Sequence, residues 1–144
     1  MNLPSKHLYN AALQLNRGSE ARRLTSISHA GIVRDVLRDF SAREATVYVW
    51  LIMPDHIHVL FSTRRQLKDL DTFLGRVKRR INQNLVRRDM PKLHWQHGAV
   101  NHPITWPEIE EARDYILLNP VRGGYVHVPS QWPHQETPAP LPGI

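Results

Sequence analysis

Short apolar runs alternate along the chain with stretches in which apolar residues recur every three or four positions. The apolar run 8–15 ends at Asn16-Arg17-Gly18 and predicts a strand followed by a turn. Helical spacing of apolar residues then predicts a helix over 29–41, with Ser28 as a possible cap. The β-branched and aromatic run 46–53 predicts a strand that is buried on both faces.

The second half of the chain continues this alternation. A turn at Pro54-Asp55 predicts that 56–62 returns as the second strand of a hairpin. Apolar residues at steps of three or four then predict a long amphipathic helix over 66–89, and 98–105 is compatible with one more strand. The capping-box pattern at 105–108 predicts a helix over 106–118, which should end near Asn119 because a proline follows.

The order of these elements is strand, helix, hairpin, long helix, short strand and helix, which predicts an α+β fold with helices packed on a mainly antiparallel sheet. A length of 144 residues fits one domain, which we assign to 1–136. Five of the 11 prolines fall in the last 16 residues. We therefore predict that 137–144 is an extended, weakly ordered Pro-rich tail.

Composition narrows the class of protein. With 41% hydrophobic and 22% charged residues, the chain is typical of a globular domain. Because it has no cysteine, disulfides and cysteine-based zinc sites are excluded, and any metal must use His, carboxylate, amide or water ligands. No stretch approaches the roughly 20 apolar residues of a membrane span, and the N-terminus lacks the core of a signal peptide. We therefore expect a cytoplasmic protein with no membrane partner.

Positive charge is concentrated in one segment. The net charge of the chain is +6, whereas 64–92 alone carries ten Lys/Arg and three Asp. Within the predicted long helix, Arg76, Arg79, Arg80 and Arg87 lie on the side opposite the apolar stripe. Such a local excess is typical of a protein that holds a polyanion along one face, although a merely solvated helix surface is the alternative.

Two histidines at the start of the second hairpin strand are candidate metal ligands. His56 and His58 are separated by one residue, so that a strand sends both imidazoles to the same face. Two imidazoles on one face form half of a metal site. The alternative is that one histidine packs in the core and the other is incidental.

Three further residues are candidates for chemistry or binding. Tyr115 and Asn119 are four residues apart and lie on one side of the predicted last helix. A tyrosine hydroxyl can act as a nucleophile when a metal or base lies beside it, and an Asn carbonyl is an oxygen ligand that suits Mg²⁺ or Mn²⁺. A packing tyrosine and an Asn C-cap are the alternative. Trp95 is a candidate for stacking a DNA base, with core packing as its alternative.

Three motifs in this order resemble the REP-associated tyrosine transposases, which are HUH-type single-tyrosine transposases of the small insertion-sequence superfamily. The motifs are Met53-Pro54-Asp55-His56-Ile57-His58-Val59-Leu60, then Trp95-Gln96-His97-Gly98 with Asn101-His102, then Tyr115-Ile116-Leu117-Leu118-Asn119-Pro120-Val121-Arg122-Gly123-Gly124. The resemblance covers about 8–134. The chain departs from the family at Asn101, where Asp is usual, and at Gly124-Tyr125, where an apolar residue commonly follows the glycine.

The resemblance implies a ferredoxin-like sheet and a DNA transesterase. Mg²⁺ or Mn²⁺ would bind to His56, His58 and Asn119, and Tyr115 would attack a phosphate of single-stranded DNA to give a 5′-phosphotyrosine and a free 3′-hydroxyl, with no nucleotide cofactor. The substrate would be a repetitive extragenic palindrome, a hairpin flanked by a short recognition tetranucleotide. The expected source is a bacterium, with a nucleoid-associated monomer or homodimer.

DNA contacts are expected from the basic helix and from two motif residues. These candidates are Arg76, Arg79, Arg80, Arg87, Trp95 and Arg122. The competing hypothesis is a non-catalytic DNA-hairpin-binding regulator with the same fold, although a pure binder has no need of the His, His, Tyr and Asn set. A His-metal hydrolase with a water nucleophile is a third reading, which leaves Tyr115 without a role.

Overall fold

The computed structural model describes residues 6–18 and 23–143. Its main elements follow in the order β1 (His7–Gln14), α1 (Ile27–Arg43), β2 (Thr46–Ile52), β3 (His56–Thr63), α2 (Leu70–Arg87) and β4 (Val100–Asn101). The remaining elements are η1 (Trp106–Glu108), α3 (Ile109–Leu117), α4 (Asn119–Arg122), η2 (Pro129–Gln131) and β5 (Gln135–Glu136).

The described strands form one antiparallel sheet in the order β4-β1-β3-β2-β5. Along the chain, the first six helices and strands occur in the order βαββαβ, and the strand order 4-1-3-2 in the sheet is the ferredoxin-like arrangement. β5 extends the sheet beside β2. The predicted α+β, ferredoxin-like class is therefore confirmed.

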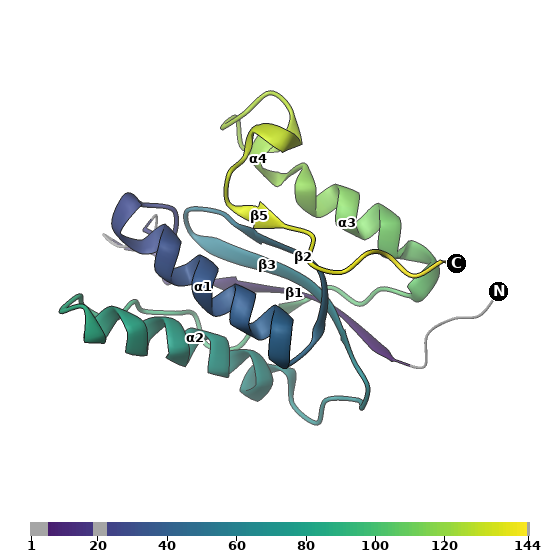
Figure 1. The fold of residues 1–144 in the computed structure, drawn as a ribbon, viewed down its shortest axis with the longest axis horizontal. Helices are drawn as coiled ribbons and strands as arrows, with labels where there is room; N and C mark the ends of the chain where they lie inside the picture. Colours follow the sequence, from purple (N-terminus) through teal and green to yellow (C-terminus); the bar gives the residue numbers. More distant parts are fainter. Residues whose placement is uncertain (1–5, 19–22, 144) are drawn as a thin grey trace.

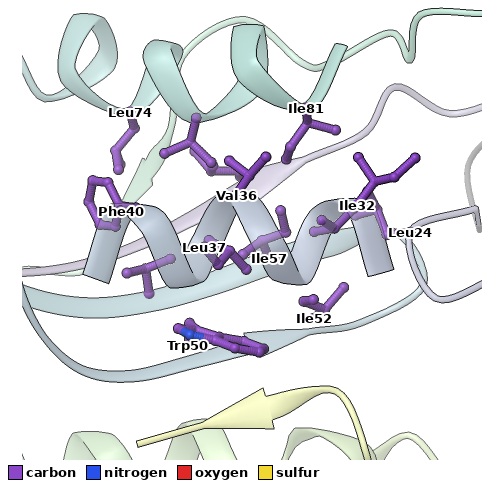
Figure 2. Packing of buried hydrophobic residues seen from close by; sticks show 14 of the residues in the cluster. Leu24, Ile32, Val36, Leu37, Phe40, Trp50, Ile52, Ile57, Leu74 and Ile81 are labelled. Carbon is purple, nitrogen blue, oxygen red and sulfur yellow. The ribbon is translucent and has the colours of Figure 1, made fainter. Parts of the chain in front are cut away.

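Helices cover both faces of the sheet (Figure 1). Helices α1 and α2 pack together on one face, and Phe40, Leu74 and Ile81 are buried in the core there (Figure 2). The other face is covered by α3 and the C-terminal segment, with Ile109, Ile116 and Trp132 buried. No helix in the described residues has the length and apolar composition needed to cross a membrane.

The hairpin β2–β3 is buried on both faces because each strand lies between these two helical layers. On β3, Ile57, Val59 and Phe61 belong to the core under α1 and α2, whereas Leu60 belongs to the core under α3. A bulge in β2 interrupts the pairing register between Val47 and Val49. The strict alternation on β3 places His56 and His58 on the α3 side of the sheet.

Three helix starts differ from the prediction, and one of them is that of α3, which begins only at Ile109 because residues 106–108 form the 3₁₀ helix η1. Helix α2 begins at Leu70 and not at 66, because the Asp69 carboxylate accepts a hydrogen bond from the Asp71 amide at 3.0 Å and caps the helix there. Leu67 still packs against the core, which explains why it continued the apolar pattern. Helix α1 begins at Ile27 after Ser26, two residues before the predicted start.

The end of the chain also differs from the prediction. Helix α3 ends at Leu117, but Pro120 then stands in the first turn of α4, where its missing N–H costs no hydrogen bond. The predicted weak order of the Pro-rich tail is wrong for its first part. The Ala139 amide donates to the Val47 carbonyl at 2.9 Å, because the edge of β2 offers unpaired backbone groups. The division between 136 and 137 stays a prediction.

Candidate active site

A cavity of about 280 Å³ lies on the α3 side of the sheet. Strands β1 and β3, the segment after β4, and helix α3 supply its walls. The lining residues are Asn10, His58, His102, Ile104, Glu108, Glu111, Ala112 and Tyr115. The cavity therefore brings together one candidate metal ligand and the candidate nucleophile from segments 57 residues apart in the sequence.

His58 is held in the sheet by one neighbour on β1 and one directly after β4. Its side chain is buried, and its Nε2–H donates to Oδ1 of Asn10 at 2.8 Å. The ring stacks on His102, with centroids 5.8 Å apart. Because Nε2 carries the proton, the lone pair of the neutral imidazole is on Nδ1.

The electrostatic surroundings keep His58 neutral. Burial first, and then the nearby charges of His56, His102 and Arg122, together lower the pKa of His58 to about 3. A neutral imidazole is the form that binds a metal ion. His58 is therefore in the protonation state that a metal ligand requires.

His56 begins β3 and is oriented by the residue before it. Its Nδ1–H donates to Oδ1 of Asp55 at 2.8 Å, which leaves Nε2 with the free lone pair. A carboxylate that fixes the second ring nitrogen is the usual partner of a metal-ligating histidine. The donor chemistry of this histidine pair therefore fits a divalent metal ion.

Asn119 completes the predicted ligand set only in part. It begins α4, and its amide Nδ2 donates to the Ile116 carbonyl at 3.2 Å, which leaves Oδ1 as an oxygen donor. It does not line the cavity, and in the described residues no hydrogen bond joins it to either histidine. No group of three or more His, Asp or Glu able to hold a metal occurs in the part of the chain that the structure describes. The three-residue ligand set stays a prediction.

Tyr115 lies in α3 with its side chain at the mouth of the cavity. The residue is 61% exposed, so that a macromolecular substrate can reach its hydroxyl. The guanidinium carbon of Arg122 lies 3.9 Å from the centroid of its ring. Arg122 thus places a positive charge on the Tyr115 ring, and the same charge contributes to the lowered pKa of His58.

Comparisons with known proteins show which proteins this chain resembles. No family model matches the chain. A curated REP-associated tyrosine transposase of Escherichia coli (strain K12) is 24% identical over 93 residues, which are 63% of this chain and 53% of that protein. The resemblance that the motifs indicated is confirmed. The match spans about half the length of this curated relative.

Two solved structures share the fold. A REP-associated tyrosine transposase bound to a REP hairpin superposes with a TM-score of 0.67 and 21% identity, covering 89% of this chain and 74% of that one. A transposase-like protein of Deinococcus radiodurans has a TM-score of 0.53 and 17% identity, covering 77% and 88%. At these identities the likeness to the solved transposases is one of fold.

The basic helix lies across the sheet from this cavity, because α2 packs on the face opposite α3 (Figure 1). Arg76, Arg79 and Arg87 are exposed there. Arg80 differs from them, because it is an ion-pair partner of Glu44 and of Asp39, the latter at 3.2 Å. Arg80 therefore joins α2 to the C-terminal end of α1, and its guanidinium already has two carboxylate partners within the protein.

Trp95 is not an open stacking platform. It bridges Leu15 of the segment after β1 and packs half-buried against the core under α1 and α2, with its indole N–H buried. The loop that follows is fixed by Lys78, whose ammonium group donates to the carbonyls of Gln96 at 2.9 Å and Gly98 at 2.7 Å. The structure thus favours core packing for Trp95.

The cavity residues that the sequence analysis did not identify as site residues include Asn10, His102 and Glu111. Asn10 is a polar interruption of the apolar run 8–15, and this was the signal that could have revealed it. His102 stood within a motif but was given no role. Nothing in the sequence marks Glu111 as a site residue, because carboxylates are common on exposed helix faces. Only its position in the lining of the cavity distinguishes it from other surface glutamates.

Proposed function

We propose that this chain is a metal-dependent single-stranded DNA endonuclease and strand transferase that acts at palindromic repeat hairpins. Similarity to a REP-associated tyrosine transposase supports a transposase-like, DNA-binding function in general. The observation that carries the specific proposal is the cavity shared by exposed Tyr115 and neutral His58, with the guanidinium of Arg122 on the Tyr115 ring. A solved relative in fold was bound to a REP hairpin, which supports hairpin DNA as the substrate.

In the proposed reaction the Tyr115 oxygen attacks the phosphorus of one phosphodiester. A P–O(Tyr) bond forms as the P–O3′ bond breaks, the tyrosine proton is released, and the departing 3′-oxygen takes up a proton. The products are a 5′-phosphotyrosine and a free 3′-hydroxyl. The reverse attack by a 3′-hydroxyl rejoins the strand and releases Tyr115, so that the number of phosphodiester bonds is conserved and no nucleotide cofactor is needed.

Mg²⁺ or Mn²⁺, held by His56, His58 and Asn119, would supply Lewis-acid stabilisation of charge on the phosphate oxygens. The protein's own groups prepare these ligands. Asp55 orients His56, and Asn10 orients His58. The guanidinium of Arg122, on the ring of the nucleophile, offers planar donors to the same phosphate.

The structure has one basic region at Arg122 and another on α2, and each could contact a different part of a DNA hairpin. A single strand at the cavity would contact Arg122, whereas the exposed Arg76, Arg79 and Arg87 lie on the opposite face of the sheet. One strand segment cannot touch both faces without passing around an edge of the sheet. We therefore propose that α2 holds a different part of the hairpin, through sequence-independent phosphate contacts.

The test is a covalent-adduct assay. The protein is incubated with Mn²⁺ and a DNA hairpin that carries single-stranded flanks, and the products are resolved on a denaturing gel. The wild-type protein and Tyr125→Phe, which alters another exposed tyrosine, should form a protein–DNA adduct. Tyr115→Phe should form none while it still binds the hairpin.

Each competing hypothesis has its own result. An adduct that persists in Tyr115→Phe rejects the proposed nucleophile. DNA cleavage without an adduct in the wild type indicates a hydrolase with a water nucleophile. Hairpin binding without cleavage or adduct, with either Mg²⁺ or Mn²⁺, indicates the non-catalytic regulator.

A further inference from the structure

The cavity contains a carboxylate that the proposed transesterification does not use. Glu111 lines it together with Tyr115 and His58, and it has no hydrogen-bond or ion-pair partner among the described residues. Glu108 also lines the cavity, but its Oε1 already accepts from the Thr105 amide and hydroxyl, both at 2.8 Å. Glu111 is therefore the carboxylate that is free to bind a ligand.

A free carboxylate beside the nucleophile conflicts with a polyanionic substrate unless it receives a hydrogen bond. The phosphates and sugars within a DNA strand carry no hydrogen-bond donor, because every backbone oxygen is an acceptor. The donors of DNA are the N–H groups on the edges of its bases. The partner that suits Glu111 is therefore a base edge and not the backbone.

The shape and lining of the cavity suit a single base. Its volume of about 280 Å³ lies just below the range of about 300–1,000 Å³ that is common for ligand pockets. Ile104 and Ala112 supply apolar surface for the face of a ring, and His102 and Asn10 supply further polar groups. Enzymes that take a base out of its stack use this combination of apolar walls and polar groups on the base edge.

We propose that this cavity binds one unstacked base next to the scissile phosphate, and that Glu111 selects guanine. Guanine alone presents two adjacent donors, N1–H and N2–H, which one carboxylate can accept together. Adenine and cytosine offer only an amino group on that edge, and thymine offers a single ring N–H. This inference rests on the proposed function, since it places the base beside the phosphate that Tyr115 attacks.

The first experiment selects binders from hairpins whose single-stranded flanks are randomised. Tyr115→Phe serves as the parent protein, so that binding is measured without cleavage. The parent should enrich guanine at one flank position. Adding Glu111→Gln should remove the guanine preference at that position only, whereas Glu110→Gln, the same charge change at a neighbour outside the cavity, should preserve it.

The second experiment measures the contact atom by atom. Replacing the selected guanine by hypoxanthine removes only the N2 amino group and should weaken binding by roughly 5- to 150-fold, as expected for a bidentate pair. In the Glu111→Gln background the same replacement should change affinity by less than about threefold, because the pair is already broken. The 7-deazaguanine substrate keeps both donors and should bind like guanine.

Three outcomes overturn the proposal. The first is a parent protein that enriches no base at any flank position. The second is an unchanged guanine preference in Glu111→Gln, with its fold verified by circular dichroism. The third is a Glu111→Gln protein that keeps its base preference but loses Mn²⁺ affinity in the absence of DNA, which would make Glu111 a metal ligand. Adduct formation by the wild type is scored separately, so that failure of the base site and failure of the nucleophile are distinguished.

Discussion

The guanidinium carbon of Arg122 lies 3.9 Å from the centroid of the Tyr115 ring. The two residues come from different short helices, α3 and α4, and Pro120 in the first turn of α4 sets the bend between them. The contact holds the ring of the proposed nucleophile from one side and leaves a cation at the position where a phosphate would approach. Arg122 is thus both a positioning residue for Tyr115 and a candidate phosphate ligand.

Replacing Arg122 with Ala should slow adduct formation. A charge-assisted hydrogen bond is worth about 1.5–3 kcal/mol, which corresponds to roughly 10- to 150-fold in the single-turnover rate. Arg122→Lys should recover only part of this, because an ammonium group keeps the charge but not the planar fork. Rates are measured with excess protein on a denaturing gel. Arg34→Ala on α1 is the control. An equal loss of rate in Arg34→Ala would mean that the effect comes from the lower net positive charge and not from the position of Arg122.

Asp55 should control metal affinity through His56. Removal of a carboxylate that orients a metal-ligating histidine typically lowers metal affinity by about 10- to 100-fold. Asp55→Ala should therefore weaken Mn²⁺ binding to the free protein in a calorimetric titration, whereas Asp35→Ala on α1 should not. Wild-type Mn²⁺ affinity in Asp55→Ala would show that the hydrogen bond of 2.8 Å to His56 has no part in metal binding.

The sequence predicted two pairs of candidate site residues, but it did not predict that the fold brings His58 and Tyr115 to one cavity. The period of a strand was enough to place His56 and His58 on one face, because strand geometry is local. Whether that face lies under α3 or under α2 depends on how the helices cross over the sheet, which is a property of the whole chain. For this reason the basic helix was predicted as an exposed cationic face without any sign that the sheet separates it from Tyr115.

Replacing Arg76 and Arg79 of α2 should affect DNA binding differently from replacing Arg80. Each phosphate contact contributes about −0.7 to −0.9 to the slope of log affinity against log salt, so the double change Arg76→Ala and Arg79→Ala should flatten the slope by roughly 1.5 units. Arg80→Ala should leave the slope unchanged and lower the stability of the fold, because Arg80 is paired with Glu44 and Asp39. Hairpin binding is measured by fluorescence anisotropy at several salt concentrations.

The contrary results for α2 are equally specific. If the double variant keeps the wild-type slope of log affinity against log salt, Arg76 and Arg79 do not contact phosphates. DNA binding would then have to be assigned to Arg122 and its surroundings. A flattened slope in Arg80→Ala would mean that Arg80 leaves its carboxylate partners when DNA binds. The sequence alone could not separate Arg80 from its neighbours, because its partners lie 36 and 41 residues away at the C-terminal end of α1.

Stability should fall as the pH drops below about 6.5, in part through His29. Burial, followed by the charge of Arg23, lowers the pKa of His29 below its usual 6.5. Between the lowered pKa and 6.5 the unfolded chain binds a proton that the folded chain does not, so the free energy of unfolding falls by up to about 1.4 kcal/mol for each unit by which the pH is lowered. Urea unfolding of metal-free protein at several pH values measures this dependence.

His29→Gln should make that pH dependence shallower. The pKa values of His58 and His134 are also lowered by burial, so the variant should keep part of the wild-type slope. His127→Gln changes an exposed histidine and serves as the control. If the curves of wild type and His29→Gln stay parallel from pH 7.5 to 5, the hydrogen bonds of His29 to Ser26 and Ser28 tolerate the charged ring.

Deleting 137–144 should destabilise the protein and promote self-association. The deletion removes the hydrogen bond from the Ala139 amide to Val47, together with the packing of Ala139 and Leu141 on the core under α3. We expect a loss of about 1–3 kcal/mol from one hydrogen bond and two partly buried apolar side chains. The deletion also uncovers the start of β2, and an uncovered strand edge can pair with another copy. Thermal unfolding and light scattering measure the two effects, with deletion of 142–144 as the control. If the 137–144 deletion leaves the melting temperature unchanged and the protein monomeric, the tail is weakly ordered, as its prolines predicted.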